Sequence, residues 1–430
     1  MAVDTSLELR NQVMYSVFVR NHTEEGTFQA LKRDLDRIRN LGVDIVWLLP
    51  IYPIGEQARK GSLGSPYAIR DYRNVNPELG TMDDFRELVD AIHARGMRCI
   101  IDIVYNHTSP DSVLACGHPE WFYRRPDGSL YNRIGDWTDI VDLDYSHKEL
   151  WDYQIETLKQ WASVVDGFRC DVAPLVPLEF WMEARKQVSS VRPGCLWLSE
   201  SVEPEFIVWN RSRGIGCLSD SEMYQAFDIT YDYDIFGDFQ QYLNGGVSLD
   251  TYADRINRQE SIYPENYVKL RFLENHDRER IASLTADIPS LINLTAFLYF
   301  QKGITLLYGG QEYVCTKKPE LFEKDPFSRN TACELAPLMQ RLYAIRKDSI
   351  FRCSSYEVHA CSDDFLVAEH RQNGCKMVGV FCVKGSRGNV HVDLPDGVYE
   401  NLIDGKSVKI LAGSVRVDGA PVILKAADCA

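Results

Sequence analysis

The feature that most constrains the fold of this chain is an alternation of short apolar runs and helical segments across residues 1–348. The first helical segment has apolar side chains every three or four positions: Phe28, Leu31, Leu35, Ile38 and Leu41. Thr27 stands where a helix cap is expected, and Gly42 stands where that helix should stop. Thr81 and Gly96 bound a second segment of the same kind. Such an alternation predicts a parallel sheet covered by helices.

Eight apolar runs are expected to form the strands of that sheet. They are residues 15–19, 44–50, 97–104, 164–171, 196–200, 216–221, 268–273 and 304–308. Eight parallel strands, each followed by a helix, are the number that closes a (β/α)8 barrel. We therefore predict an α/β fold whose main domain is a (β/α)8 TIM barrel.

Two segments depart from this pattern. Residues 107–147 lack helical periodicity and are rich in Pro, Gly, Asp and aromatic residues, which indicates a short inserted domain after strand three. From residue 349, short alternating runs are separated by Asp-Gly pairs at 396–397, 404–405 and 418–419, a turn pattern of antiparallel sheets. We predict a barrel formed by residues 1–106 and 148–348, an inserted domain at 107–147, and a C-terminal antiparallel β-sandwich at 349–430.

Acidic residues close several of the expected strands. Four segments carry them: Asp-Ile-Val-Tyr-Asn-His at 102–107, Gly-Phe-Arg-Cys-Asp at 167–171, Trp-Leu-Ser-Glu at 197–200, and Asn-His-Asp at 275–277. The carboxyl ends of parallel barrel strands meet at one face, where barrel active sites are built. Three acids with a basic partner and imidazoles suit the cleavage of glycosidic bonds.

The residues themselves suggest how these acids divide the chemistry. Arg169 and Asp171 are two positions apart on one strand, so their side chains point the same way and the guanidinium favours an ionised carboxylate. Ionised Asp171 suits nucleophilic attack on an anomeric carbon. A negative charge facing Glu200 would raise the pKa of Glu200 and make it a proton donor. Asp277 is expected to hold sugar hydroxyls and to stabilise the transition state.

The composition argues against some classes of partner. A formal net charge of −15 leaves no excess of cations to neutralise phosphates, so we expect no nucleic-acid partner. No apolar stretch approaches the roughly 18 residues needed to span a membrane, so we expect no membrane association. The aromatic share of 11% provides flat surfaces that suit sugars, although most of these rings must serve core packing.

The twelve cysteines are not spaced like a disulfide framework or a zinc site. They contain no C-x-x-C pair, and several stand within or beside apolar runs, where a free thiol behaves as a small hydrophobe: Cys99, Cys170, Cys195 and Cys382. The first residues include early acids and no apolar stretch of signal-peptide type. We therefore expect a reduced, cytoplasmic protein.

The acidic segments resemble the conserved regions of the α-amylase family, glycoside hydrolase family 13. The family's D-x-x-x-N-H is matched at 102–107, its G-x-R-x-D at 167–171, its acid/base Glu by Glu200, and its N-H-D at 275–277. Ser-Pro-Tyr-Ala-Ile-Arg-Asp-Tyr at 65–72 resembles the stretch that carries a stacking Tyr. Residues 303–312 resemble the last barrel region, with Thr305 in place of the usual Pro. The resemblance covers essentially the whole chain.

This resemblance implies a role for each matched residue. Asp171 would be the nucleophile, Glu200 the general acid/base and Asp277 the transition-state stabiliser. The implied substrate-binding residues surround the −1 subsite, which holds the sugar whose bond is cleaved: Tyr67, His107, Arg169 and His276. Asp102 and Asn106 would be mainly structural.

Two departures from the family pattern bear on cofactors and specificity. The Lys-His pair that follows the nucleophile in calcium-dependent members is replaced by Val-Ala-Pro-Leu at 172–175, and an aspartate-rich N-terminal loop by Asn-His-Thr-Glu-Glu-Gly at 21–26. We therefore expect no cofactor and no metal site, since calcium would lack its usual ligand pattern. Ile-Val-Asp-Leu-Asp-Tyr at 140–145 matches neither inserted-domain motif that separates subfamilies, so the linkage stays open.

Aromatic residues outside the motifs have two interpretations, core packing or outer sugar subsites. One group lies in the inserted segment: Trp121, Phe122, Tyr123 and Trp137. The other lies after the expected sixth strand: Tyr224, Phe227, Tyr231, Tyr233 and Phe236. Core packing is the commoner fate of such rings.

The sequence thus predicts a retaining α-glycosidase that hydrolyses α-1,4 bonds in malto-oligosaccharides or related α-glucans through a covalent glycosyl-enzyme. A 4-α-glucanotransferase or an α-glucosidase on the same scaffold is the nearest alternative, because its catalytic residues would be identical. A non-catalytic sugar-binding relative is a more remote one, because such relatives lack part of the acid set. The sequence does not give chain-length preference, endo or exo action, or oligomeric state.

Overall fold

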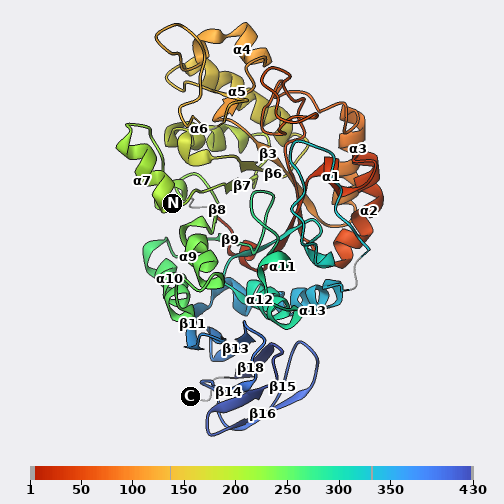
Figure 1. The fold of residues 1–430 in the computed structure, drawn as a ribbon, viewed down its shortest axis with the longest axis vertical. Coiled ribbons are helices and arrows are strands. Elements are labelled where there is room, and N and C mark those ends of the chain that lie inside the picture. Colours follow the sequence, from red (N-terminus) through yellow and green to blue (C-terminus); the bar gives the residue numbers. More distant parts are fainter. Residues whose placement is uncertain (1–4, 136, 331–332, 428–430) are drawn as a thin grey trace.

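The computed structural model describes residues 5–135, 137–330 and 333–427. Figure 1 shows helices around a central barrel, with the C-terminal sheets at one end of the molecule. The barrel is closed by parallel strands in the order β1-β10-β9-β8-β7-β6-β3-β2. The strands are β1 (Val13–Val17), β2 (Ile45–Leu48), β3 (Arg98–Ile103), β6 (Gly167–Cys170), β7 (Leu196–Ser199), β8 (Ile229–Tyr231), β9 (Lys269–Arg271) and β10 (Ile304–Tyr308). Nearly all their side chains are buried, as in a parallel sheet covered on both faces. The predicted TIM barrel is confirmed.

Helices connect the strands and cover the barrel. The longer ones are α2 (Phe28–Asn40), α3 (Met82–His93), α5 (Lys148–Ala162), α6 (Leu178–Val188), α7 (Pro204–Ser212), α9 (Tyr233–Leu243), α10 (Leu249–Ile262), α12 (Ile288–Phe300) and α13 (Ala336–Arg346). Thr27 caps α2, because its hydroxyl accepts a hydrogen bond from Ala30 N at 3.2 Å. Thr81 and Asp84 form a capping box at the start of α3. None of the helices in the described ranges is both long and apolar enough to cross a bilayer.

The sixth barrel strand is not where the sequence placed it. Residues 216–221, predicted to be a strand, are irregular up to the short helix α8 (Asp220–Met223). Glu222 accepts hydrogen bonds from the backbone N and the hydroxyl of Ser219, both at 2.7 Å, and this arrangement starts a helix. The strand forms later, at β8. The first strand also ends earlier than predicted, because α1 (Val19–His22) begins two residues after it.

The inserted segment between β3 and α5 is held by a small antiparallel pair, β4 (His107–Thr108) and β5 (Val141–Asp142). It also contains α4 (Val113–Gly117) and a 3-10 turn, Pro119–Trp121. Trp121 and Phe122 are buried, so they form the core of this segment. Tyr123 is half-buried against the Arg133 guanidinium, which lies 4.3 Å from the centre of its ring.

The C-terminal region forms two antiparallel four-stranded sheets, and the predicted β-sandwich is confirmed. One sheet contains β11 (Ser355–Ser362), β12 (Phe365–Gln372), β13 (Cys375–Cys382) and β18 (Val422–Ala427), and the other β14 (Gly388–His391), β17 (Ser414–Val417), β16 (Ser407–Leu411) and β15 (Gly397–Glu400). Valines from both sheets, such as Val380 and Val415, share one core. Asn373 and Gly374 join β12 to β13 with φ of 50° and 72°, as a type I′ turn requires.

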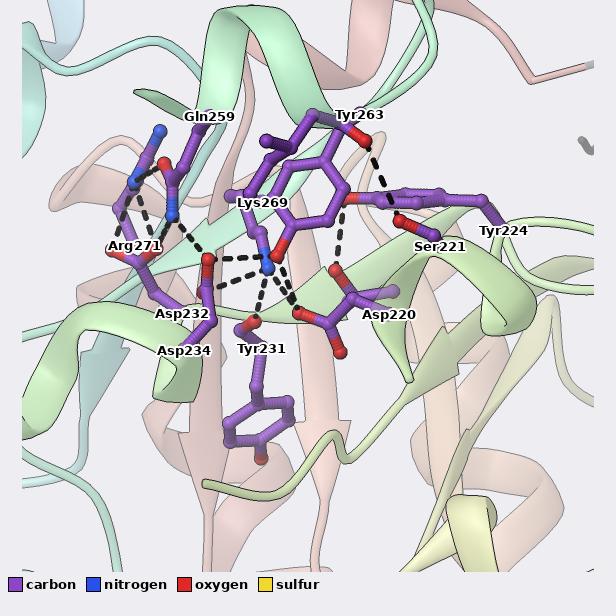
Figure 2. Close-up of polar contacts among 12 residues, drawn as sticks. Asp220, Ser221, Tyr224, Tyr231, Asp232, Asp234, Gln259, Tyr263, Lys269 and Arg271 are labelled. Atoms are coloured by element: carbon purple, nitrogen blue, oxygen red, sulfur yellow. Dashed lines mark hydrogen bonds and ion pairs between the residues drawn. The ribbon is translucent and has the colours of Figure 1, made fainter. Parts of the chain in front are cut away.

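Charged side chains of β9 meet aspartates from α8 and from the start of α9 inside the fold (Figure 2). Lys269 pairs with Asp220 and, at 2.8 Å, with Asp234. Arg271 Nη1 lies 2.8 Å from Asp232 Oδ1. Lys269 and Arg271 have no solvent exposure, so these pairs join β9 to α8 and α9 inside the fold. We refer to these five residues together with Gln259 as the Lys269 cluster.

Candidate active site

Three acids stand beyond the carboxyl ends of separate barrel strands and meet at one cavity. Asp171 directly follows β6, Glu200 directly follows β7, and Asp277 lies in the loop after β9. The cavity has a volume of about 290 Å³. It is lined by six of the residues predicted from the sequence: Tyr67, His107, Asp171, Glu200, His276 and Asp277. Segments far apart in the chain therefore converge as expected.

Arg169 is the buried centre of charge beneath this cavity. Its Nη1 lies 2.8 Å from Asp102 Oδ1 and 2.9 Å from Asp171 Oδ1, and its Nη2 lies 2.7 Å from Glu200 Oε1. Burial lowers the pKa of Arg169, but the charges of Asp102 and Glu200 outweigh burial and raise it well above its ordinary value. Arg169 is fully buried and is not among the side chains that line the cavity. The sequence placed it against the sugar, whereas in the structure it stands behind the acids and holds them.

Glu200 differs from an ordinary carboxylic acid in its protonation. Burial raises the pKa of Glu200 well above its usual value, and the charges of Asp171 and Asp277 raise it further, while Arg169 opposes them. The direction agrees with the expectation, although burial and not the neighbouring negative charge is the largest cause. Glu200 Oε2 accepts a hydrogen bond from the backbone N of Val172 at 2.7 Å. Val172 has φ of 33°, a left-handed conformation that is costly for a β-branched residue.

The two oxygens of Asp171 have different surroundings. Oδ1 accepts a hydrogen bond from Arg169, whereas Oδ2 lies 3.9 Å from His107 Nε2, beyond hydrogen-bonding distance. One oxygen is thus held and the other is free to react. Asp277 is more open to solvent, with 41% of its side chain exposed, and its Oδ2 lies 3.1 Å from His276 Nε2.

Tyr67 and His276 form a stacked pair at the cavity wall. Their ring centres are 5.5 Å apart at an interplanar angle of 12°. The Tyr67 hydroxyl donates to Asp102 Oδ2 at 3.1 Å and lies 2.7 Å from His276 Nε2. Burial lowers the pKa of His276 to about 4, so its ring is neutral near pH 7. The pair joins the cavity surface to the buried Arg169 charges through Asp102.

Sequence reasoning missed several side chains that line the same cavity. Lys60, Asp139 and Phe322 stand in three different loops, which carry no periodic pattern that would report their course. Trp137 also lines the cavity, with its ring centre 5.6 Å from that of His107, so the subsite interpretation is favoured for this one residue of the inserted group. The aromatic residues after α8 are all buried and pack in the core: Tyr224, Phe227, Tyr231, Tyr233 and Phe236.

The cysteines nearest the acids are packing residues. Cys170, next to Asp171, is fully buried, and burial raises the pKa of its thiol well above the ordinary value. Cys99, Cys195 and Cys382 are buried thiols outside any disulfide. Among the residues that the structure describes, no group of three or more His, Cys, Asp or Glu side chains is arranged to hold a metal ion.

A (β/α)8 barrel with three carboxylates around one cavity at its carboxyl-terminal mouth defines a class of sugar-cleaving enzyme. Comparison with known families makes this specific. The model of the alpha amylase catalytic domain matches residues 12–116 and 114–356, and that of the bacterial alpha amylase C-terminal domain matches residues 357–424. The chain belongs to the α-amylase family and is a glycoside hydrolase of the α-amylase type.

Individual relatives agree with this assignment. The crystal structure of an α-amylase from Lactobacillus plantarum is 49% identical, with a TM-score of 0.96 over 98% of this chain and 100% of that one. The noncanonic maltogenic α-amylase AmyB from Thermotoga neapolitana is 33% identical, with a TM-score of 0.87 over 97% of this chain and 99% of that one.

Curated relatives share less of their length with this chain. The α-amylase MalA of Haloarcula japonica is 28% identical over 70% of this chain and 44% of its own length. An α-1,4-glucan:maltose-1-phosphate maltosyltransferase of Myxococcus xanthus is 34% identical over 45% of this chain and 32% of its own. The chain therefore spans less than half the length of these two relatives.

Proposed function

We propose that this protein is a retaining α-glycosidase that hydrolyses α-1,4 bonds in malto-oligosaccharides or related α-glucans. The observation that carries this proposal is the arrangement around Arg169: Asp171 and Glu200 share one buried guanidinium and line one cavity, and burial raises the pKa of Glu200. A pair of acids with one ionised and one protonated member is what a two-step glycosidase needs.

In the first step, Asp171 Oδ2 attacks the anomeric carbon while Glu200 gives its proton to the leaving glycosidic oxygen. The carbon–oxygen bond to the leaving sugar breaks as the ester bond to Asp171 forms. Arg169 donates a hydrogen bond to Asp171 Oδ1 and so holds the carboxylate in place. Because burial raises its pKa, Glu200 keeps the proton that it gives to the leaving oxygen.

In the second step, the Glu200 carboxylate takes a proton from water, and the resulting hydroxide attacks the anomeric carbon. The ester bond to Asp171 breaks and the free carboxylate returns to Arg169. Asp277, the most exposed of the three acids, is placed to hold sugar hydroxyls and to stabilise positive charge on the ring. We assign Tyr67, His107 and His276 to the wall of the −1 subsite, and Asp102 and Asn106 to its support.

A transferase or an α-glucosidase on the same scaffold is the second candidate, and the maltosyltransferase similarity keeps it open. Incubation with maltotriose followed by product separation distinguishes the possibilities. Hydrolysis yields glucose and maltose, transfer yields chains longer than maltotriose, and exo-hydrolysis that continues to completion yields glucose alone. A non-catalytic sugar-binding protein would bind maltotriose and release nothing.

The retaining step has its own test. Proton NMR of the first products from an α-linked substrate should give the α-anomer before mutarotation, whereas an inverting enzyme would give the β-anomer. The buried thiols of Cys99, Cys170, Cys195 and Cys382 suit a reducing compartment, and we infer that the protein works in the cytoplasm.

A further inference from the structure

One side of the cavity is lined by side chains that the catalytic chemistry does not use. Lys60 Nζ pairs with Asp139 Oδ1 at 2.9 Å and lies 5.9 Å from the ring centre of Phe322. Asp139 belongs to the inserted segment and is almost buried, with 5% of its side chain exposed. These three residues, with Leu321, all line the cavity, and we refer to them as the Lys60 wall. Lys60 thus bridges the inserted segment and the loop after β10.

The Lys60 wall is braced from behind. The backbone N of Ser62 donates to Glu323 Oε1 at 2.7 Å, and that of Leu63 donates to the carbonyl of Phe322 at 3.1 Å. The two loops pack so closely that a Cβ at Gly61 would lie 2.6 Å from the Phe322 Cβ. Because the loops after β2 and β10 support each other in this way, the wall is part of the fold and not a single mobile side chain.

The strand order places this wall relative to the acids. Lys60 lies in the loop after β2 and Phe322 in the loop after β10, and both strands are direct neighbours of β1. Glu200 follows β7, which is separated from β1 by three strands in either direction around the closed barrel. By strand order, Lys60 and Phe322 therefore come from the side of the barrel opposite the proton donor, while Asp139 reaches them from the inserted segment.

The positions of the Lys60 wall and of Glu200 determine which end of a substrate meets the wall. The leaving sugar departs on the side of the acid that protonates it, so the reducing-end part of the chain lies towards Glu200. The non-reducing-end part must then point across the barrel mouth towards β1, where the Lys60 wall stands. The cavity volume of about 290 Å³ corresponds to roughly ten waters of ~30 Å³ each, so the space beside the acids is small compared with a long glucan chain.

On the basis of the proposed function, we infer that the Lys60 wall limits the donor side of the site to one or two glucosyl units. The enzyme therefore works from the non-reducing end of short α-glucans and not within long chains. Lys60, Asp139 and Phe322 act as specificity residues, because they meet the terminal sugar and take no part in bond cleavage. The carboxylate of Asp139 and the ammonium of Lys60 are placed to bind the hydroxyls of that terminal unit.

The test uses maltoheptaose carrying a nitrophenyl label at its reducing end, in two forms. One form has a free non-reducing end, and the other has O4 and O6 of that terminal glucose blocked by a cyclic acetal. The wild-type enzyme should first shorten the free form by one or two units, and should cleave the blocked form at least about 100-fold more slowly. Chromatography of the labelled products at low conversion gives both the cleavage position and kcat/KM.

Variants assign the effect to the wall. The double variant Lys60→Ala with Phe322→Ala should raise kcat/KM on the blocked form at least about tenfold relative to the free form. Lys324→Ala is the matched control, because Lys324 stands in the same loop, outside the cavity lining, and donates to the carbonyl of Glu25. It should leave the ratio of the two rates unchanged.

Each outcome decides a separate claim. Internal cleavage of both forms at similar rates would overturn the inference and leave the proposed hydrolase intact. If the wild-type enzyme cleaves the blocked form slowly and the double variant cleaves it just as slowly, the Lys60 wall is not the cause of the slow cleavage. Failure to cleave either form would overturn the proposed function, and the inference with it.

Discussion

Two clusters of buried charge both contact Tyr231 of β8, and each combines cationic side chains with carboxylates. In one, Arg169 holds Asp102, Asp171 and Glu200 beneath the cavity. In the other, the Lys269 cluster, two cations of β9 hold three aspartates inside the fold (Figure 2). A count of buried acids and bases would not tell them apart.

The two clusters differ in what their acids face. Asp171 and Glu200 line an open cavity, and among the residues that the structure describes, no partner lies within hydrogen-bonding distance of Asp171 Oδ2. In the Lys269 cluster, Gln259 donates to both Asp232 and Asp234 at 2.9 Å, so the carboxylates are bound by protein groups on several sides. Acids that are saturated with protein partners hold the fold together, whereas acids left partly unpartnered at a cavity are free to meet a ligand.

Tyr231 lies between the clusters and shows how they are related. Its carbonyl accepts a hydrogen bond from Lys269 at 3.1 Å, while its ring points away from the Lys269 cluster in Figure 2. On that side, the Arg169 guanidinium lies 5.6 Å from the ring centre. The Lys269 cluster therefore holds the strand that carries Tyr231, whose ring packs against Arg169 beneath the site.

The largest expected effect comes from exchanging one acid in each cluster. Asp171→Asn should lower kcat at least about 1000-fold with the fold intact, because the amide cannot form the glycosyl ester. Asp234→Asn should leave kcat of the folded enzyme unchanged and lower stability by about 1–3 kcal/mol. Turnover with maltotriose and urea unfolding measure the two quantities. Equal losses of turnover in both variants would contradict the distinction between the clusters.

Lys269→Met should give the next largest effect. It should lower the free energy of unfolding and leave the activity of the folded enzyme unchanged. It leaves Asp220 and Asp234 buried without their cation, which costs about 3–5 kcal/mol of unfolding free energy. Lys32→Met is the matched control, since its pair with Glu87 is exposed and worth at most about 1 kcal/mol. Equilibrium unfolding in urea measures both. A cost for Lys269→Met as small as that of the control would mean that the cluster does not stabilise the fold.

The pH dependence of activity should report the raised pKa of Glu200. The first step needs protonated Glu200, so kcat/KM falls as pH rises through this pKa, which burial has moved above the ordinary glutamate range. In Glu200→Gln, a glycosyl fluoride, whose leaving group needs little protonation, should react without this alkaline limb. An alkaline limb that persists unchanged in the variant would show that another group causes it.

Tyr67→Phe should have the smallest effect of this series. It keeps the stack on His276 but removes hydrogen bonds to Asp102 and His276, lowering kcat/KM by about tenfold to 100-fold. Tyr399→Phe is a suitable control, because its hydroxyl donates to the carbonyl of Pro395 in the exposed C-terminal sheet. Rates on maltotriose measure both variants. A Tyr67→Phe enzyme as active as the control would show that the Tyr67 hydroxyl does not contribute to catalysis.

Much of the fold was predictable because barrel strands are short apolar runs at regular spacing. The run at 304–308 coincides with β10, and acids at strand ends converge because parallel strands finish at one face. The sixth strand was predicted in the wrong place because β8 has only three residues, whereas the capping pattern at Ser219 and Glu222 starts a helix within the predicted run. Asn373-Gly374 is a strong hairpin signal in the sequence, and it forms the turn between β12 and β13.

The rest of the site depends on loops and on burial, which a linear pattern does not report. The meeting of Lys60, Asp139 and Phe322 depends on how three irregular segments fold against one another. The Lys269 cluster had one signal, since residues 268–272 read Val-Lys-Leu-Arg-Phe, with two cations inside a run that had to be buried. Buried cations require buried acids, so a run of this kind indicates a structural charge network.

The most direct test of the central claim is to trap the glycosyl-enzyme and locate it. A 5-fluoro-α-glucosyl fluoride, which forms the intermediate faster than it is hydrolysed, is incubated with the enzyme, and peptides are sequenced by mass spectrometry. The mass of one fluoroglucosyl group should appear on Asp171, and Asp171→Asn should carry none. A label on Glu200 or on an aspartate of the Lys269 cluster, or inactivation without a covalent adduct, would contradict the assignment of Asp171 as the nucleophile.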